Sequence, residues 1–233
     1  MRSSDLLCHS TPRLELLADL IQEYNTVADI GCDHAYLSIL LARRGKRVIA
    51  SDVAQGPHDK ARENIARFSM ESSIELRLGD GLLTLERGEA EAIVIAGMGG
   101  LLIADIISAG KHLLTESTRL FLQPMRADED LRAFLYANGF EILSEHLVRE
   151  DRRIYTVLEV QFGKTDRFSV LDCAFSPALR KSRPPLFEDY FNWKKRILAG
   201  IIAETAQAEK SGLQQEFAEK MQAYEAFEKG EII

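Results

Sequence analysis

A parallel α/β sheet followed by a helical hairpin is the fold that the sequence predicts. Between residues 12 and 162, short apolar runs typical of buried strands alternate with stretches of helical periodicity. The first apolar run stops at Gly31 and a helical run follows, which is the strand–turn–helix opening of a nucleotide-binding α/β unit. From residue 187 onward the apolar spacing is helical. We therefore expect a Rossmann-like, seven-stranded, mostly parallel sheet with a C-terminal α-helical, coiled-coil-like hairpin.

The composition limits the class of protein. The chain has 233 residues, of which 46% are hydrophobic and 28% charged, so a sizeable core is expected. Because the net charge is −7, binding to nucleic acid would have to rest on local basic patches. Three scattered cysteines argue against a disulfide framework or a zinc site. With no signal-peptide core and no membrane span in the sequence, we expect a cytoplasmic protein that binds no metal.

Caps, glycines and apolar runs mark the first elements. Thr11 and Pro12 start a helix, because a hydroxyl cap followed by proline suits a first helical turn. Gly45 ends the helix that follows Gly31, and Gly56 opens the next one. The strands between these helices are expected at residues 26–30, 47–51 and 74–78.

The second half continues the alternation and then reverses direction. Residues 92–96 are apolar throughout, which is typical of a central parallel strand buried on both faces. A helix, a strand and a second helix follow at residues 101–109, 119–122 and 128–138. Two final strands are expected at residues 140–146 and 154–161, separated by a short polar turn, so this pair is antiparallel.

We expect three segments along the chain. Residues 1–163 form the α/β domain, which binds the ligand. Residues 164–186 contain several prolines and little periodicity, which is typical of a linker with a docking segment. Residues 187–233 form the helical hairpin, and Ser211-Gly212 separates its two arms.

Acidic residues and glycines follow the predicted strand ends, where a parallel sheet binds its ligand. They are Asp29, Gly31, Asp52, Asp80 and Gly97. The dinucleotide motif G-x-G-x-x-G is absent, and an acidic turn disfavours a pyrophosphate, so a nicotinamide dehydrogenase is not expected. S-adenosylmethionine fits better, because it carries a sulfonium, an ammonium and an adenosine. Asp52 suits the ribose hydroxyls, Asp80 the adenine amino group and Asp29 the ammonium. This is the layout of a class I S-adenosylmethionine-dependent methyltransferase.

Each of these acids also has a structural explanation as a helix cap or turn former. That alternative is serious for Asp80, which lies between two glycines. It is weaker for Asp52, because its distance from Gly31 along the chain is the one expected of a ribose-binding acid.

The run Asp29-Ile-Gly-Cys-Asp-His-Ala-Tyr-Leu37 closely resembles the first motif of the bacterial tRNA (adenine(22)-N1)-methyltransferase family, TrmK. The resemblance covers most of the chain. It continues in Val53-Ala-Gln-Gly-Pro57, Arg77-Leu-Gly-Asp-Gly-Leu82, Ala96-Gly-Met-Gly-Gly100, Leu122-Gln-Pro124, Leu147-Val-Arg-Glu-Asp151, Ile154-Tyr155, Phe175-Ser-Pro177 and Pro185-Leu-Phe187. Two residues depart from the family pattern: Ser38 stands where proline is expected, and Met125 stands where asparagine is frequent.

The resemblance implies methyl transfer from S-adenosylmethionine to N1 of adenine 22 in tRNA. The matching motifs imply cofactor contacts at Asp29, Gly31, Asp52, Val53, Asp80, Gly81, Gly97 and Met98. No Asn/Asp-Pro-Pro-aromatic tetrad follows the fourth strand, which argues against an exocyclic amine as target. Asp33 is the candidate catalytic carboxylate, and His34 and Tyr36 are candidates for holding the flipped base. Their structural alternatives are a helix-start residue for His34 and simple packing for Tyr36.

Basic residues predict where tRNA phosphates would bind. The candidates are Arg43, Arg44, Arg180, Lys181, Arg183 and Lys194, and the alternative is a solvated charged face. For the hairpin, the alternatives to a tRNA platform are a dimerising coiled coil or a helical cover for the sheet. A monomer is expected, with a dimer as the alternative. Other candidate functions are methylation of another RNA or a small molecule, and a non-catalytic S-adenosylmethionine- or RNA-binding protein.

Overall fold

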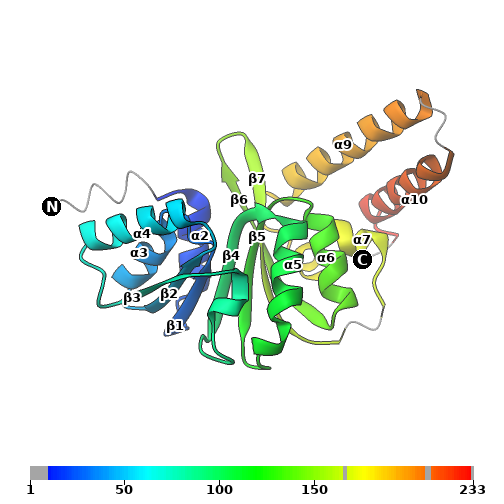
Figure 1. Ribbon diagram of the computed structural model, residues 1–233. Helices are drawn as coiled ribbons and strands as arrows, with labels where there is room; N and C mark the ends of the chain where they lie inside the picture. The colour runs from blue at the N-terminus through cyan, green and yellow to red at the C-terminus, as the bar shows by residue number, and fades with distance from the viewer. Residues whose placement is uncertain (1–9, 165–166, 208–210, 232–233) are drawn as a thin grey trace.

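A computed structural model describes residues 10–164, 167–207 and 211–231 of the chain. It contains one seven-stranded sheet with helices on both faces and two long helices that extend away from it (Figure 1). The strands are β1 (Thr26–Ile30), β2 (Arg47–Asp52), β3 (Ile74–Leu78), β4 (Ala92–Gly99), β5 (Arg119–Arg126), β6 (Phe140–Glu150) and β7 (Arg153–Phe162). The helices of the α/β part are α2 (Pro12–Leu20), α3 (Tyr36–Arg43), α4 (Gln55–Arg67), α5 (Gly100–Gly110) and α6 (Asp128–Ala137).

The strand order is β3-β2-β1-β4-β5-β7-β6. All neighbouring strands from β3 to β5 are parallel, and β7 is antiparallel to both β5 and β6. The predicted seven-stranded, mostly parallel sheet is therefore confirmed. The order reverses at β1 and β4, so their carboxyl ends open onto the crevice in which such sheets bind ligands.

Two buried clusters cover the faces of the sheet. Helices α2, α3 and α4 pack on one face, where side chains such as Leu17, Leu41 and Ile65 meet Val27 and Val94 of the strands. Helices α5 and α6 pack on the opposite face. Alternate residues of β1 belong to opposite clusters, as the two-residue period of a strand requires.

The central strands are longer than the sequence predicted. Strand β4 continues through Gly97 and Met98 to Gly99, and β5 continues through Gln123 and Pro124 to Arg126. The pairing register shifts at Met98 and again at Gly99. The sequence predicts that the strand ends before Gly97. In the structure Gly97 allows a bulge, and β4 and β5 stay paired beyond it.

The antiparallel β6–β7 hairpin is also longer than expected. Arg149 and Glu150 were predicted to lie in the turn, but they pair with Ile154 and Arg153. The turn itself contains two residues, and Asp151 adopts a φ of 53° there. The hairpin consequently rises above the rest of the sheet, toward the long C-terminal helices (Figure 1).

The segment expected to be a linker contains two short helices, α7 (Val170–Ala174) and α8 (Pro177–Ser182). Ser169 forms a capping box with Asp172, and Ser176 caps α8 ahead of Pro177. Prolines were interpreted as breaks in structure, whereas Pro177 starts a helix.

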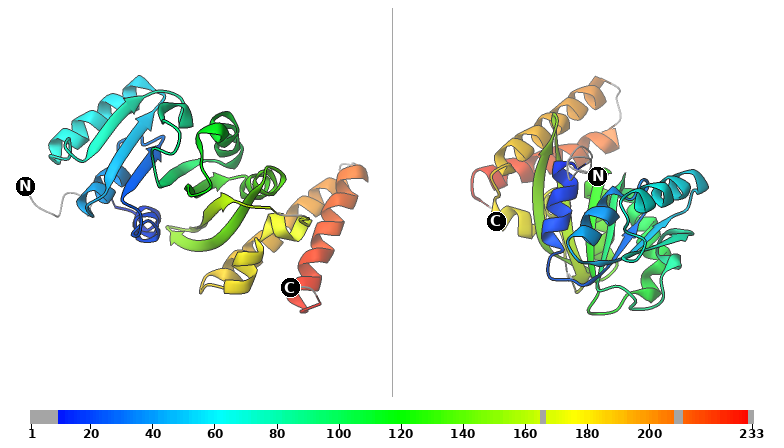
Figure 2. Two further views of the ribbon diagram at one scale, coloured as in Figure 1. Left: turned by 90° about the horizontal axis from the view of Figure 1, so that it is seen from below. Right: turned by 90° about the vertical axis from the view of Figure 1, so that its left-hand side faces the viewer.

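The helical hairpin consists of α9 (Phe187–Gln207) and α10 (Ser211–Glu228), which lie side by side (Figures 1 and 2). Ser211 begins α10, so Ser211 and Gly212, which were predicted to separate the two arms, belong to the second helix. A third buried cluster joins the root of the hairpin to α7 and α8, with Phe175, Phe187, Tyr190 and Tyr224 at its centre. The predicted C-terminal helical hairpin is confirmed.

Candidate active site

The turn between β1 and α3 is the centre of the candidate site. Gly31, Asp33 and Ala35 all have a positive φ, of 72°, 49° and 59°. The N–H groups of Gly31 and Cys32 both donate to the Ser51 carbonyl of β2, at 2.8 and 2.9 Å. Left-handed conformations are costly for Asp and Ala, and such backbone strain gathers at functional sites. The neighbouring strand thus holds the turn in a shape that exposes Asp33.

Asp52 ends β2 beside this turn. One of its carboxylate oxygens accepts the Asp33 N–H at 3.1 Å, and the other accepts the Ala54 N–H at 2.9 Å. The side chain is buried, yet a carboxylate has about four lone-pair sites, so acceptor capacity remains for two further donors. The carboxylate therefore fixes the turn and can still accept hydrogen bonds from a pair of hydroxyls.

Asp29 lies deeper, within β1, with 4% of its surface exposed. The Ser38 hydroxyl of α3 donates to it at 2.5 Å. Burial raises the pKa of Asp29 to about 6, although the Ser38 hydrogen bond works in the opposite direction. Ser38, one of the two departures from the family pattern, is thus a direct partner of this acid. A buried carboxylate with a raised pKa is stabilised by an incoming cation such as an ammonium.

Glycines shape the space beside these acids. A Cβ on Gly31 would lie 1.9 Å from the Met98 Cε, which is the flexible end of that side chain, and the φ of 72° is what favours glycine here. Gly97 has a φ of 77° and open space where a Cβ would project. Val53 and Asp80 are exposed at the ends of β2 and β3. The structure brings the predicted cofactor residues to one edge of the sheet.

The structure shows whether Asp80 is a helix cap, which is one structural explanation that the sequence left open. It occupies the N-cap position of a short 3₁₀ helix, Gly81–Thr84, but its side chain makes no capping hydrogen bond. Gly81 follows with a φ of 51°. The helix-cap explanation of Asp80 is therefore not supported, and its exposed carboxylate is available to a ligand.

The three candidate catalytic side chains lie at the exposed rim of the same turn. The His34 Nε2 is 3.7 Å from the Asp33 Oδ1, and the side chains are 43% and 70% exposed. The rings of His34 and Tyr36 meet edge to face, with centroids 5.9 Å apart. Asn64 of α4 donates to the His34 carbonyl at 3.0 Å, which fixes the backbone but leaves the imidazole at the rim. An acid and two aromatic rings that lie together on one exposed turn can hold a planar base.

Sequence reasoning missed a hydrogen-bonded pair beside Gly97, formed by Gln123 and Arg13. The Gln123 side chain is fully buried, and its Oε1 accepts the Gly97 N–H at 3.1 Å and an Arg13 N–H at 2.8 Å. Its amide donates to the Pro124 carbonyl at 2.8 Å. The amide therefore links the bulge of β4 to the end of β5. Leu122-Gln-Pro124 was noted as part of the family resemblance, but nothing in the sequence linked it to Gly97.

Arg13 connects this pair to the β6–β7 hairpin. Its guanidinium forms an ion pair with Glu150 at 3.0 Å and lies 4.9 Å from the centre of the Tyr155 ring. It also contacts the Met125 sulfur at 3.2 Å. Met125 is the second departure from the family pattern, so this difference lies in direct contact with Arg13. The position of Arg13 in α2 gave no signal of such a role.

The candidate tRNA-binding residues differ in how exposed they are and in whether an acidic side chain already pairs with them. Arg43 is exposed and lies over the Phe68 ring. Arg44 forms ion pairs with Glu15 at 2.7 Å and Asp19 at 2.6 Å, so its charge is largely neutralised. Lys181 and Arg183 are exposed at the end of α8.

Lys194 and Arg180 are not placed as the sequence suggested. Each is only 8% exposed. Lys194 pairs with Asp128 and Glu129, and Arg180 pairs with Asp172. A charge held in a buried pair is not offered to a phosphate, so both are reassigned from tRNA binding to packing of the hairpin root.

Within residues 10–164, 167–207 and 211–231, no group of histidine, cysteine, aspartate and glutamate side chains is arranged to hold a metal ion. In the same part of the chain, no helix has the length and hydropathy needed to cross a membrane.

A family model and a curated relative both match the chain and both point to the same family. The family model described as tRNA (adenine(22)-N1)-methyltransferase, TrmK, matches residues 27–226. The curated tRNA (adenine(22)-N1)-methyltransferase of Bacillus subtilis is 40% identical over 156 residues, which is 66% of this chain and 66% of that protein. The alignment therefore spans about two thirds of the length of this relative.

Solved structures are similar over nearly the whole chain. The Bacillus subtilis m1A22 tRNA methyltransferase TrmK has a TM-score of 0.83 and 32% identity, covering 93% of this chain and 97% of that one. Streptococcus pneumoniae Sp1610, in complex with S-adenosyl-L-methionine, has a TM-score of 0.80 and 34% identity, covering 91% and 96%. The similarity includes the C-terminal helices as well as the sheet.

Proposed function

Since this chain belongs to the tRNA (adenine(22)-N1)-methyltransferase family, we propose that it methylates N1 of adenine 22 in tRNA with S-adenosylmethionine. The observation that carries the proposal is the β1–α3 turn. This one turn is hydrogen-bonded to Asp52 on its cofactor side and presents Asp33, His34 and Tyr36 on its outer side.

The donor set of the crevice fits the cofactor. When bound, S-adenosylmethionine would supply a methyl group that its sulfonium activates. Adenine N1 would receive that methyl group through its in-plane lone pair. Asp29 stabilises the ammonium, and the remaining acceptor sites of Asp52 bind the ribose hydroxyls. Asp80 accepts from the adenine amino group, and Val53, Gly81, Gly97 and Met98 line the space between these acids.

The rim of the turn positions the target base. N1 of adenine loses no proton before it is methylated, so catalysis consists chiefly of orientation. The methylated base carries a positive charge, which the Asp33 carboxylate stabilises. His34 and Tyr36 hold the extruded base through their ring faces and polar atoms. Arg13 holds Gln123, which in turn fixes the backbone of Gly97.

The tRNA reaches this turn along the basic surface that remains after the buried pairs are set aside. Arg43 lies on the α3 side, next to Arg44, whose charge is largely neutralised by its two ion pairs. Lys181 and Arg183 lie on the α8 side. We expect the protein to act as a monomer in the cytoplasm, where tRNA is found.

The test is methyl transfer from labelled S-adenosylmethionine to an unmodified tRNA transcript, followed by nucleoside mass spectrometry. A matched transcript carries guanine in place of adenine 22. N1-methyladenosine in the first transcript and none in the second is the expected result. Methylation of both would refute the site while keeping the reaction, and no product from either would refute the activity.

A further inference from the structure

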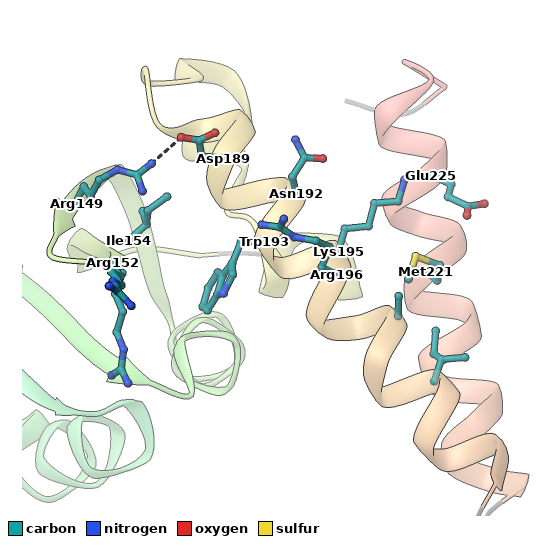
Figure 3. A pocket seen from close by; sticks show the side chains of 13 residues that line it. Arg149, Arg152, Ile154, Asp189, Asn192, Trp193, Lys195, Arg196, Met221 and Glu225 are labelled. Atoms are coloured by element: carbon teal, nitrogen blue, oxygen red, sulfur yellow. Dashed lines mark hydrogen bonds and ion pairs between the residues drawn. The ribbon is translucent and has the colours of Figure 1, made fainter.

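A broad groove lies between the β6–β7 hairpin and the helical hairpin, outside the site described above. Its volume is about 1030 Å³. We refer to it as the hairpin groove. Figure 3 shows Arg149 and Arg152 on the β6–β7 side and Trp193 and Arg196 extending from α9. On the far side it reaches Met221 and Glu225 of α10. The groove combines cations, an aromatic ring and an open entrance.

Three arginines of the hairpin groove have unsatisfied charge. Arg152, Arg153 and Arg196 are exposed, and none has an ion-pair partner among the described residues. The other two cations of the groove are paired: Arg149 with Asp189 at 2.6 Å and Lys195 with Glu228 at 2.6 Å. On a chain with a net charge of −7, three unpaired guanidiniums on facing elements form a local anion-binding surface.

Trp193 is the aromatic element of the groove. It is 42% exposed, although a tryptophan is normally among the most buried side chains. Its ring is tilted over Tyr190 at 5.9 Å between centroids, so it is supported from below. Ile197, one turn further along α9, is 44% exposed and adds apolar surface. A supported, exposed indole flanked by guanidiniums is a stacking platform for a nucleobase.

A smaller cavity adjoins the hairpin groove and extends toward the end of β5. Its volume is about 430 Å³, and it shares Arg153, Ile154 and Trp193 with the groove. Its other end is lined by Pro124 and Met125 of β5. Pro124 pairs with Met98, next to Gly97 and its Gln123 contact. The groove and this cavity together therefore reach from the helical hairpin to the end of β5, which pairs with the cofactor candidate Met98.

We propose that the hairpin groove binds an unpaired stretch of the tRNA next to the methylated adenine, with one base stacked on Trp193 and phosphates on Arg152, Arg153 and Arg196. This inference rests on the proposed function for the identity of the polyanion. Stacking is tolerant of sequence, so the groove contributes affinity and orientation, and the choice of adenine remains with the turn at Asp33.

Fluorescence offers a direct test, because Trp193 is the only tryptophan of the chain. The full-length protein is titrated with unmodified tRNA, and the emission, corrected for absorption by the RNA, is recorded. Stacking predicts saturable quenching with the same Kd as the anisotropy of labelled tRNA. Binding of tRNA without a change in Trp193 emission would overturn the proposal.

Variants separate stacking from charge. Trp193→Ala should weaken tRNA binding about tenfold, and Trp193→Phe, which keeps an aromatic face, should weaken it by a smaller factor. Arg152→Ala with Arg196→Ala should lower the slope of log K against log salt by about 1.4, because each single-stranded phosphate contact contributes about 0.7. Unchanged affinity in Trp193→Ala would refute the stacking role.

Arg87→Ala is the matched control for a single arginine change. Arg87 is exposed in the loop that enters β4 at its amino end, opposite the site. Its removal should change the tRNA Kd less than twofold. An equal effect of Arg87→Ala and Arg196→Ala would indicate general electrostatics and contradict the groove. A dimer that dissociates in Trp193→Ala would show that the groove joins two copies, and would also refute the proposal.

Binding of tRNA in the hairpin groove and methylation of adenine 22 can be tested independently. Titration of S-adenosylmethionine into every variant reports whether the cofactor crevice is intact. If the wild-type protein methylates adenine 22 and Trp193→Ala binds tRNA normally, the groove is wrong and the proposed function stands. If the wild-type protein binds tRNA with quenching of Trp193 but methylates nothing, the proposed function is wrong and the groove stands.

Discussion

Asp29 shows how one buried side chain makes cofactor binding depend on pH. Its pKa, raised to about 6 by burial, is higher than the value of an unfolded chain. The folded, ligand-free protein therefore holds a proton on Asp29 that the unfolded chain releases, and the stability that this proton provides is lost as pH rises through about 6. A cationic ligand has the opposite preference, because it binds the ionised form.

We therefore predict that affinity for S-adenosylmethionine rises with pH through this range. With a pKa of about 6, the ionised fraction of Asp29 falls about tenfold between pH 7 and pH 5, and the affinity should fall in proportion. Isothermal titration across that range measures the effect. Asp29→Asn should bind more weakly and lose this pH dependence. A wild-type affinity that does not change between pH 5 and pH 7 would contradict the ammonium contact.

Asp33 can be tested with a substitution that respects its backbone. Its φ of 49° is tolerated by asparagine better than by alanine, so Asp33→Asn removes the charge with little added strain. We expect kcat for tRNA methylation to fall about 10- to 100-fold, since a carboxylate no longer stabilises the charged product. The Kd for S-adenosylmethionine should change less than threefold. Normal kcat at saturating substrates would show that Asp33 has no chemical role.

Among the elements, α6 and α9 are joined by a buried ionic cluster. Arg132 of α6 has no exposed surface and pairs with Glu145 of β6 at 2.5 Å and Asp128 at 2.9 Å. Asp128 also accepts the Tyr190 hydroxyl and the Lys194 ammonium of α9. Burial alone would raise the pKa of Asp128, but Arg132 and Lys194 lower it well below its usual value. The cluster fixes the root of the helical hairpin on the sheet.

Removal of the central cation should therefore destabilise the protein strongly. Arg132→Met keeps the volume but leaves Glu145 buried without its ion-pair partner, which costs about 3–5 kcal/mol. Urea unfolding followed by circular dichroism gives the free energy. Lys195→Ala is the control, because the ion pair of Lys195 with Glu228 joins α9 to α10 but is partly exposed. Its loss should lower the free energy of unfolding by less than about 1 kcal/mol. Equal costs for the two variants would refute the special role of the buried cluster.

The elements were predictable where periodicity determines them and less so where tertiary contacts do. Strands β1 to β3 begin and end close to the expected residues, because apolar runs and glycines mark them. Strand β4 passes through Gly97, since pairing with β5 outweighs the local preference of glycine for a turn. Lys194 and Arg180 look like surface cations in sequence, and their burial follows from acids contributed by Asp128 and Asp172.

Over the whole molecule, the helical hairpin is better described as an extension of the α/β part than as a separate unit. Its aromatic side chains share one buried cluster with α7 and α8, and its lysines pair with acids of α6. The division at residues 163 and 187, expected from the sequence, stays a prediction. It can be tested by cutting the chain there.

Deletion of residues 187–233 should lower the stability of the remaining chain as well as its affinity for tRNA. It exposes Phe175 and Leu179 and removes two partners of Asp128. The melting temperature should fall by several degrees, and aggregation should increase. An unchanged melting temperature and unchanged S-adenosylmethionine affinity would instead establish the hairpin as an independent domain.

The contacts of Arg13 close much longer loops of the chain than the contact between Asp33 and Asp52 does. Arg13 binds Gln123 and Glu150, which lie 110 and 137 positions away along the chain, whereas Asp33 and Asp52 are 19 positions apart. Closing long loops is entropically costly, so the contacts of Arg13 form late in folding. On the ribosome, the acidic turn can close while the second half of the sheet is still being synthesised. A nascent chain can therefore bring Asp33 to Asp52 well before Glu150 is available to Arg13.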